Sequence, residues 1–246
     1  MAALMPRLLL FDIDGTLVSS RGGIGRKAIS RVMGEIHGAP VDVTPEECAG
    51  RPDPQIVRNV FLRLGYTAED AAALLPRAMA RYLDRLEATY SIRAGAYCYP
   101  GVRDLLAFLA GEKDAVLGLL TGNHERGAGI KLRPFGLDRY FPFGAFGSDD
   151  EERPRLPAVA VARAKERTGI DFRGKDIVIV GDTVHDVSCG RQLGVTAVAV
   201  TTGPTTRKEL EAEGADLVVD SLAPTEALVS ALLGRELNAR TGRSPP

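Results

Sequence analysis

The sequence predicts an α/β protein, a doubly wound parallel sheet with an all-helical segment inserted after its first strand. Beyond residue 95, strand-like and helix-like segments alternate, which is typical of parallel sheets with helices on both faces. Near the N-terminus, the apolar run at residues 8–11 reads as a buried strand. Between them, residues 24–94 repeat their apolar positions at helical spacing and contain no convincing strand.

The individual elements follow from the same periodicities. Strands are expected at residues 8–11, 115–120, 145–146, 177–180, 197–200 and 217–219, and helices at 102–109, 126–132, 157–168, 187–193, 207–213 and 224–233. Residues 19–23, Ser-Ser-Arg-Gly-Gly, read as a flexible linker. We therefore predict a core formed by residues 1–18 and 95–235, a helical cap at 19–94, and a flexible tail at 236–246.

Composition limits the classes of partner. The chain has 246 residues, 45% of them hydrophobic and 26% charged, with a formal net charge of -1. This composition is typical of an ordinary globular protein. The near-zero net charge argues against nucleic acid or an anionic membrane as the main partner. Residues 1–7 are too few for a secretion signal, and no apolar run approaches a membrane span. We expect a cytoplasmic protein, a monomer or weak dimer, whose three cysteines stay reduced.

Polar residues follow three of the predicted strands at the point where each ends. Asp12 and Asp14 follow the first strand, and Thr121 with its neighbours follows the strand at 115–120. Asp182 and Asp186 follow the strand at 177–180. Ligands of parallel sheets bind outside the carboxyl ends of the strands, so these side chains are expected to converge.

Such an oxygen-only set, rich in carboxylates, suits a hard cation, and Mg²⁺ is the expected metal. Any one of these residues, taken singly, is better explained as a helix cap at a strand–helix turn. Helix caps do not require an acidic pair, however, and Asp12 and Asp14 would repel each other without a cation or a shared proton. The set as a whole therefore indicates an enzyme site.

Three motifs, Asp12-x-Asp14-Gly15-Thr16, Thr121-Gly122-Asn123 and Gly181-Asp182-x-x-x-Asp186, resemble motifs one, two and four of the haloacid dehalogenase-like (HAD) superfamily. The resemblance covers roughly residues 4–20 and 95–222, with the cap placed where the phosphoglycolate phosphatase-like and phosphoglucomutase-like branch carries it. It implies a HAD-like Rossmannoid core. The motifs are specific for the superfamily and say little about the substrate.

The resemblance implies a mechanism for phosphoryl transfer. Asp12 would attack phosphorus and form an aspartyl-phosphate, and Asp14 would serve as acid and then base. Mg²⁺ would be held by the Asp12 carboxylate, the backbone carbonyl of Asp14 and Asp182, with Asp186 in support. Dehalogenase members lack an acid at the position of Asp14, so hydrolysis of a phosphate ester is favoured.

The residues expected to hold the phosphoryl group are Thr121 with its neighbours Gly122 and Asn123, and a cation. The third motif of the family normally supplies a lysine, but this region has none. Arg153 stands in the corresponding position before a proline, and Arg155 is the second candidate. Alternatively, both arginines only balance the acidic residues that precede them.

Arg51 lies in the cap segment Ala49-Gly50-Arg51-Pro52-Asp53-Pro54, which resembles the substrate-specificity loop of that branch. Arg51 would reach a second anionic group of the substrate. An ordinary helix cap and turn, built from Asp53 and Pro54, explains the same residues equally well.

Together these features predict a magnesium-dependent phosphatase that hydrolyses a small phosphorylated metabolite. A sugar-phosphate mutase is the first alternative, although the hinge at residues 19–24 lacks the histidine of that branch. A receiver-type signalling domain, which also accepts phosphate on an aspartate, is a remote third.

Overall fold

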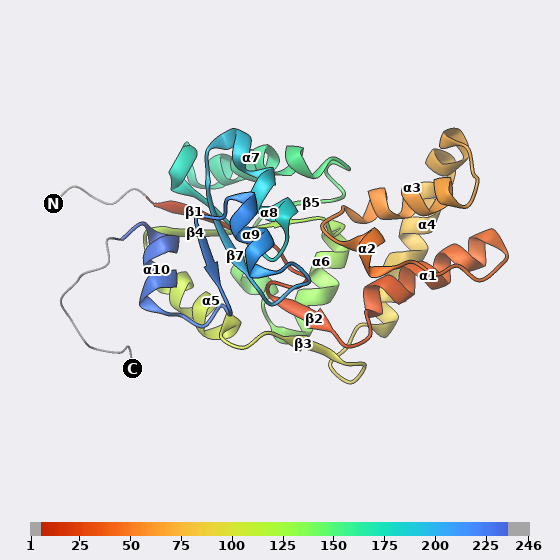
Figure 1. Cartoon of the computed structure of the whole chain (residues 1–246), viewed down its shortest axis with the longest axis horizontal. Helices are drawn as coiled ribbons and strands as arrows, with labels where there is room; N and C mark the ends of the chain where they lie inside the picture. The colour runs from red at the N-terminus through yellow and green to blue at the C-terminus, as the bar shows by residue number, and fades with distance from the viewer. Residues whose placement is uncertain (1–5, 236–246) are drawn as a thin grey trace.

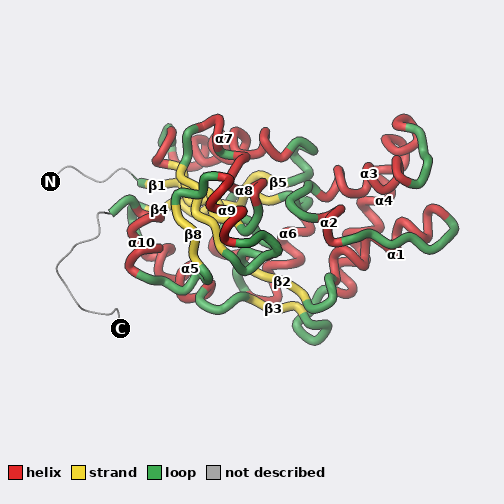
Figure 2. Tube along the Cα trace, viewed as in Figure 1, coloured by secondary structure: helices red, strands yellow, loops and turns green. Residues whose placement is uncertain are grey.

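The computed structural model describes residues 6–235, so the predicted tail at 236–246 lies outside the described residues. Six parallel strands form one sheet in the order β5-β4-β1-β6-β7-β8 (Figure 2). Their bounds are β1 Arg7–Phe11, β4 Ala115–Thr121, β5 Gly144–Phe146, β6 Ile177–Gly181, β7 Thr196–Val200 and β8 Leu217–Val219. The predicted parallel α/β sheet is thus confirmed, and β1 lies at its centre.

Helices cover both faces of this sheet (Figure 1). The helices of the core are α5 Val102–Gly111, α6 Glu125–Leu132, α7 Leu156–Thr168, α8 Val184–Cys189, α9 Arg207–Glu213 and α10 Glu226–Leu233. In β1, Leu9 and Phe11 face the apolar cluster that includes α5, α6 and α10, whereas Leu8 and Leu10 face the cluster that includes α7. Side chains alternate between the faces of a strand, so a central strand buried on both sides is apolar throughout.

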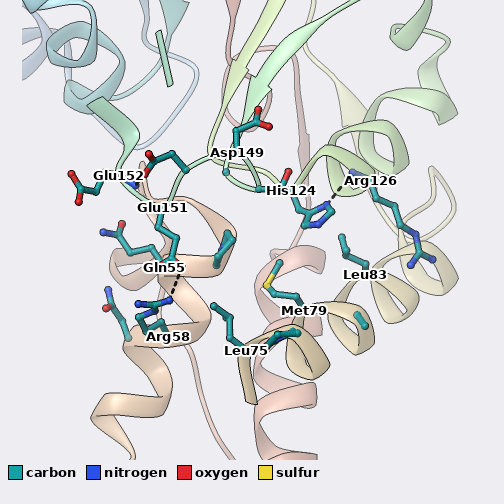
Figure 3. Close-up of a pocket in the computed structure, with 17 residues that line it drawn as sticks. Gln55, Arg58, Leu75, Met79, Leu83, His124, Arg126, Asp149, Glu151 and Glu152 are labelled. Carbon is teal, nitrogen blue, oxygen red and sulfur yellow. Dashed lines mark hydrogen bonds and ion pairs between the residues drawn. The ribbon is translucent and has the colours of Figure 1, made fainter. Parts of the chain in front are cut away.

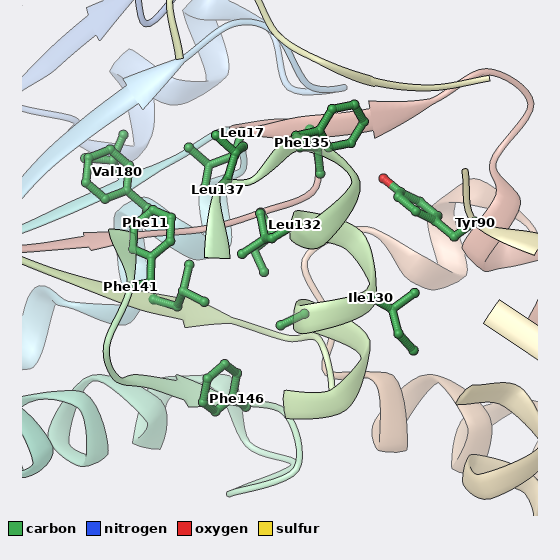
Figure 4. Packing of buried hydrophobic residues seen from close by; sticks show 14 of the residues in the cluster. Phe11, Leu17, Tyr90, Ile130, Leu132, Phe135, Leu137, Phe141, Phe146 and Val180 are labelled. Carbon is green, nitrogen blue, oxygen red and sulfur yellow. The ribbon is translucent and has the colours of Figure 1, made fainter. Parts of the chain in front are cut away.

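The packing beneath α6 fixes one wall of the pocket at the carboxyl ends of the strands. Figure 4 shows Leu132 and Leu137, at and just after the end of α6, on the side of Phe11 of β1, and Phe135 farther along the same apolar cluster. Phe11 also packs against Phe141 with ring centroids 5.9 Å apart. Because the end of α6 is buried in this cluster, side chains on its last turn have fixed positions relative to β1.

The inserted segment consists of four helices that lie beyond the carboxyl ends of the strands (Figure 1). They are α1 Ile24–His37, α2 Pro45–Cys48, α3 Asp53–Arg63 and α4 Ala68–Thr89. Helix α4 packs against both α1 and α3, as the helical periodicity of this segment predicts. The helical content agrees with the expected cap, while the division at residues 19 and 94 into separate domains stays a prediction.

Two expectations from the sequence were wrong in detail. Ser19 and Ser20, read as the start of a flexible linker at 19–23, instead belong to β2, Val18–Ser20. This strand pairs antiparallel with β3, Ala96–Cys98, and so joins the two chain crossings between the core and the cap. Three residues are too few to show strand alternation in a sequence. Helix α8 begins at Val184 rather than 187 because Thr183 caps it, its hydroxyl accepting the Asp186 amide proton.

Candidate active site

The register of the sheet brings the three polar strand ends together. Phe11 pairs with Leu119 of β4 and with Val180 of β6, so the residues that follow emerge side by side. The Asp12 amide donates to the Val180 carbonyl at 2.9 Å, which continues the hydrogen-bond ladder between β1 and β6 as far as Asp12. The structure therefore places Asp12, Thr121 and Asp182 around one pocket.

Three buried carboxylates form the centre of this site. Oxygen atoms of Asp12, Asp182 and Asp186 all lie within 4.8 Å of one another, a spacing that suits one metal ion. Burial and the neighbouring Asp186 carboxylate raise the pKa of Asp12 to about 7, and burial likewise raises the pKa of Asp182 well above its ordinary value. A dication between Asp12 and Asp182 would act in the opposite direction and keep both ionised.

Asp182 is held in place by the loop that follows β1. Its Oδ1 accepts a hydrogen bond from the Thr16 hydroxyl at 3.0 Å. Gly15 has a φ of 85°, and a Cβ on it would lie 2.2 Å from Asp182 Oδ2. Only glycine allows both this backbone conformation and this approach, so the Gly-Thr pair after Asp14 is required for the position of Asp182.

Asp186 serves the helix and the site at once. Its Oδ2 accepts from the Thr183 amide at 3.0 Å and from the Thr183 hydroxyl at 2.6 Å, completing the capping box of α8. Its Oδ1 accepts from Arg153. With both oxygens engaged by the protein, Asp186 is suited to support the metal site rather than to be a primary ligand.

Arg153 reaches the acid cluster, whereas Arg155 does not. The Arg153 side chain is buried and donates to Asp12 Oδ1 at 3.4 Å, to Asp186 and to the Gly50 carbonyl of the cap at 3.2 Å. Its Nε is buried without a hydrogen-bond partner among the described residues. Arg155 is exposed and pairs with Asp150 and Glu152. The alternative that the arginines only balance the preceding acidic residues therefore applies to Arg155 and not to Arg153.

The motif after β4 forms the opposite wall. Thr121 lies beside Asp12 in the pocket, and its hydroxyl acts to lower the pKa of the Asp12 carboxylate and so favours the ionised form. Asn123 donates to Thr121 Oγ1 at 2.8 Å and to Asp14 Oδ2 at 2.8 Å. Gly122 contacts the cap: its carbonyl accepts from the Asp53 amide at 2.7 Å, and a Cβ on it would lie 2.6 Å from the Arg51 carbonyl. A larger residue at 122 would therefore push the cap away.

The positions of Arg51 and Asp53 bear on the two interpretations of the cap loop, a substrate-specificity loop and a simple helix cap. Arg51 lines the pocket and donates to the Glu46 carbonyl at 2.6 Å. Asp53 is the first residue of α3, whose preceding residue Pro52 offers no side-chain cap, so the simple capping interpretation was wrong. The Asp53 carboxylate instead accepts from the His124 amide of the core at 2.9 Å. Burial raises its pKa to about 6.

Lys131, on the last turn of α6, was missed by the sequence analysis. It is buried and donates to Asp14 Oδ2 at 2.6 Å and to the Asn123 side-chain oxygen. Burial alone would lower its pKa, but the Asp14 and Asp53 carboxylates raise it. The sequence holds one signal: a lysine between the buried Ile130 and Leu132, four residues after Gly127, occupies the apolar side of a helix.

The acids open into a cavity of about 660 Å³ between the core and the cap. A larger cavity of about 950 Å³ lies between α3, α4 and residues 147–152 (Figure 3). Each carboxylate lining that second cavity is paired with an arginine, including Glu151 with Arg58 at 2.6 Å and Asp149 with Arg163 at 2.6 Å. The smaller cavity contains the three strand-end motifs and the buried carboxylates whose pKa values are raised, so it is the candidate active site.

The sequence model of the haloacid dehalogenase-like hydrolase family matches residues 6–194. The chain belongs to this family. Among curated proteins, it is 31% identical to a phosphoglycolate phosphatase of Rhodospirillum rubrum over 89% of each chain. It is 26% identical to a phosphoglycolate phosphatase of Pseudomonas putida over 89% of this chain and 78% of that protein. The expectation of an enzyme, a phosphoric monoester hydrolase of the HAD-like family, is thereby confirmed.

A solved structure of similar fold is CbbY from Rhodobacter sphaeroides in complex with phosphate, with a TM-score of 0.68 and 22% identity. The alignment covers 89% of this chain and 96% of CbbY. This likeness confirms the HAD-like fold. Within residues 6–235, none of the helices combines the length and apolarity needed to span a bilayer.

Proposed function

We propose that this protein is a magnesium-dependent phosphatase that hydrolyses a small phosphorylated metabolite through an aspartyl-phosphate at Asp12. One observation carries the proposal: Asp12, Thr121, Asp182 and Arg153 lie around one pocket, where carboxylates are suited to a metal and a buried guanidinium has hydrogen-bonding capacity left. A phosphoryl oxygen is an acceptor to which the unpaired Arg153 Nε–H would donate a hydrogen bond.

In the first step, an Asp12 carboxylate oxygen forms a bond to phosphorus as the bond to the leaving oxygen breaks. The leaving oxygen takes the proton of the Asp14 carboxyl group, so the product departs as a neutral alcohol. Thr121 and Arg153 hold the phosphoryl oxygens during the transfer, and the positive charge of Arg153 offsets the charge of the attacking carboxylate.

In the second step, water attacks the phosphorus of the aspartyl-phosphate. Asp14, now ionised, accepts a proton from the water as the bond between phosphorus and Asp12 breaks. Inorganic phosphate leaves, and Asp12 and Asp14 return to their initial states. One acid therefore acts twice, and its side chain must keep its position between the steps.

The donor set fits Mg²⁺. Asp12 and Asp182 would hold the ion through carboxylate oxygens and Asp14 through its backbone carbonyl, while Asp186, engaged by Thr183 and Arg153, would support them. When bound, the ion reduces repulsion between the Asp12 carboxylate and an anionic phosphate and orients the phosphoryl group. We expect activity to fall below one-hundredth after dialysis against EDTA and to return with Mg²⁺, because two buried carboxylates otherwise repel the substrate. Activity that persists without any divalent ion would contradict the metal assignment.

The cap side of the pocket indicates an anionic substrate. Arg26 and Arg51 line the pocket together with Ser19, Ser20 and Tyr99. Two arginines beyond the phosphoryl site suit a second anionic group, such as the carboxylate of phosphoglycolate, the substrate named for the curated relatives. We propose Arg51 as the residue that contacts this group.

The test is phosphate release from a panel of metabolite phosphates in Mg²⁺ buffer, including phosphoglycolate and a hexose 1-phosphate. We expect turnover to inorganic phosphate. Isomer formation from the hexose 1-phosphate without phosphate release would favour the mutase instead, and a long-lived phosphorylated protein without turnover would favour the signalling domain. The cytoplasmic location and the monomer or weak-dimer state stay predictions.

A further inference from the structure

A buried lysine lies between the proposed acid/base and the cap. Lys131 extends from the last turn of α6, and its Nζ lies 2.6 Å from Asp14 Oδ2. The Lys131 side chain is only 7% exposed, whereas the Asp14 side chain is 48% exposed. The lysine is therefore fixed within the protein, and the carboxylate that it contacts faces the pocket.

Lys131 and Asn123 together determine which oxygen of Asp14 is available. Both Lys131 Nζ and Asn123 Nδ2 donate to Oδ2, at 2.6 and 2.8 Å. The Asn123 side-chain oxygen accepts from Lys131, which fixes the orientation of the amide. Oδ1 of Asp14 has no hydrogen-bond partner among residues 6–235. A proton exchanged with a substrate or water would thus be carried by Oδ1.

The cap supplies the other side of this arrangement. The Asp53 carboxylate, on α3, is an electrostatic partner of Lys131, and the Tyr82 side chain of α4 lies beside it. A Cβ on Gly25 of α1 would lie 3.7 Å from both Lys131 Nζ and the Tyr82 hydroxyl. Lys131 therefore contacts the Asp14 carboxylate and the Asn123 amide of the core on one side, and lies next to α1, α3 and α4 of the cap on the other.

We propose that Lys131 is a positioning residue for the proton transfers of Asp14, held in its working place by Asp53 and Tyr82 when the cap is seated. The proposal rests on the proposed phosphatase function. The Oδ1 proton moves to the leaving oxygen as that oxygen separates from phosphorus, and water later returns a proton to Oδ1 as the bond to Asp12 breaks. Lys131 itself exchanges no proton with the substrate.

The role has a consequence for different leaving groups. A strongly basic leaving oxygen must receive a proton while its bond to phosphorus breaks. The rate for such a substrate therefore depends on the orientation of the Asp14 carboxyl group. A weakly basic leaving oxygen departs as an anion and does not need the acid. Loss of the positioning lysine should therefore slow the first kind of substrate selectively.

The experiment compares kcat/KM for phenyl phosphate, 4-nitrophenyl phosphate and 2,4-dinitrophenyl phosphate, whose leaving phenols decrease in basicity in that order. In Lys131→Met, which keeps the length of the side chain and removes its donors, phenyl phosphate should lose about 10²-fold and 2,4-dinitrophenyl phosphate less than about 3-fold. An equal loss for all three substrates, or no loss, would overturn the proposal.

Asp53→Asn is the second variant, because it retains Lys131 and removes only the charge presented by the cap. We expect the same selectivity with a smaller loss for phenyl phosphate, about 10-fold. A wild-type dependence on the leaving group in this variant would show that the cap plays no part. Lys165→Met, which removes an exposed lysine paired with Asp171, is the matched control and should leave all three rates unchanged.

The leaving-group comparison distinguishes failure of the positioning proposal from failure of the proposed function. If the wild-type protein does not hydrolyse any of the three phosphates, the phosphatase proposal fails. If it hydrolyses them and Lys131→Met shows no selectivity, only the positioning proposal fails. Circular dichroism and thermal melting of each variant confirm that the compared proteins are folded.

Discussion

Asp12→Asn is expected to abolish phosphate release from 4-nitrophenyl phosphate in Mg²⁺ buffer, with a loss of about 10⁴-fold or more. The amide is a far poorer nucleophile than the carboxylate and offers the metal a neutral ligand. The fold should survive, because Asp12 is buried beside Asp182 and Asp186 and its charge is repelled by theirs. In metal-free buffer, we expect the variant to melt at the wild-type temperature or above.

Two measurements complete this prediction. After brief incubation with substrate, acid-quenched wild-type protein should carry phosphate in an acid-stable, base-labile linkage, and Asp12→Asn should carry none. Asp220→Asn is the control, because that carboxylate is 84% exposed, pairs with Arg207, and should not affect turnover. Substantial turnover by folded Asp12→Asn would refute the nucleophile assignment.

Arg153→Met is expected to lower kcat by about 10²–10³-fold, while Arg155→Met leaves it within about 2-fold. The two residues form a matched pair on the same short segment, one buried against Asp12 and Asp186 and the other exposed among Asp150 and Glu152. Removing Arg153 also leaves two buried carboxylates without their cation, so we expect a loss of about 3–5 kcal/mol in the free energy of unfolding.

Arg153→Lys separates the two effects. A lysine restores the residue that the third motif of the family normally carries, and it keeps the charge but not the planar fork. We expect it to recover most of the stability and at least a tenth of the activity, as measured by thermal melting and steady-state kinetics at saturating Mg²⁺. Equal activity of Arg153→Met and Arg155→Met would show that neither arginine replaces the lysine.

The sheet and its three strand ends could be predicted because each signal is local. An apolar run followed at once by an acid marks both a buried parallel strand and its carboxyl end, as at Phe11–Asp12 and Gly181–Asp182. Parallel pairing then brings these ends together whatever the sequence distance. The arginine of the third motif followed from its place before a proline, and the structure brings it to the acids.

The contacts between the cap and the core could not be predicted in this way. Lys131, Asp53 and Tyr82 are distant in sequence, and each looks ordinary in its own helix until the packing of α3, α4 and α6 brings them together. The short β2–β3 pair was missed for the same reason, since three-residue strands are defined by their partner rather than by their own pattern.

The hydrogen bond from Arg153 to the Gly50 carbonyl joins the cation that we propose for phosphoryl binding to the cap, and the bond from the Asp53 amide to the Gly122 carbonyl joins the opposite wall of the pocket to the cap. A phosphorylated protein or nucleic acid, too bulky for the cap to settle over, would meet a site with both walls unsupported. We expect such compounds to react slowly because the site is incomplete without its contacts to the cap, and not because the pocket entrance repels them. We therefore expect the protein to select phosphate esters that are small enough for the cap to cover.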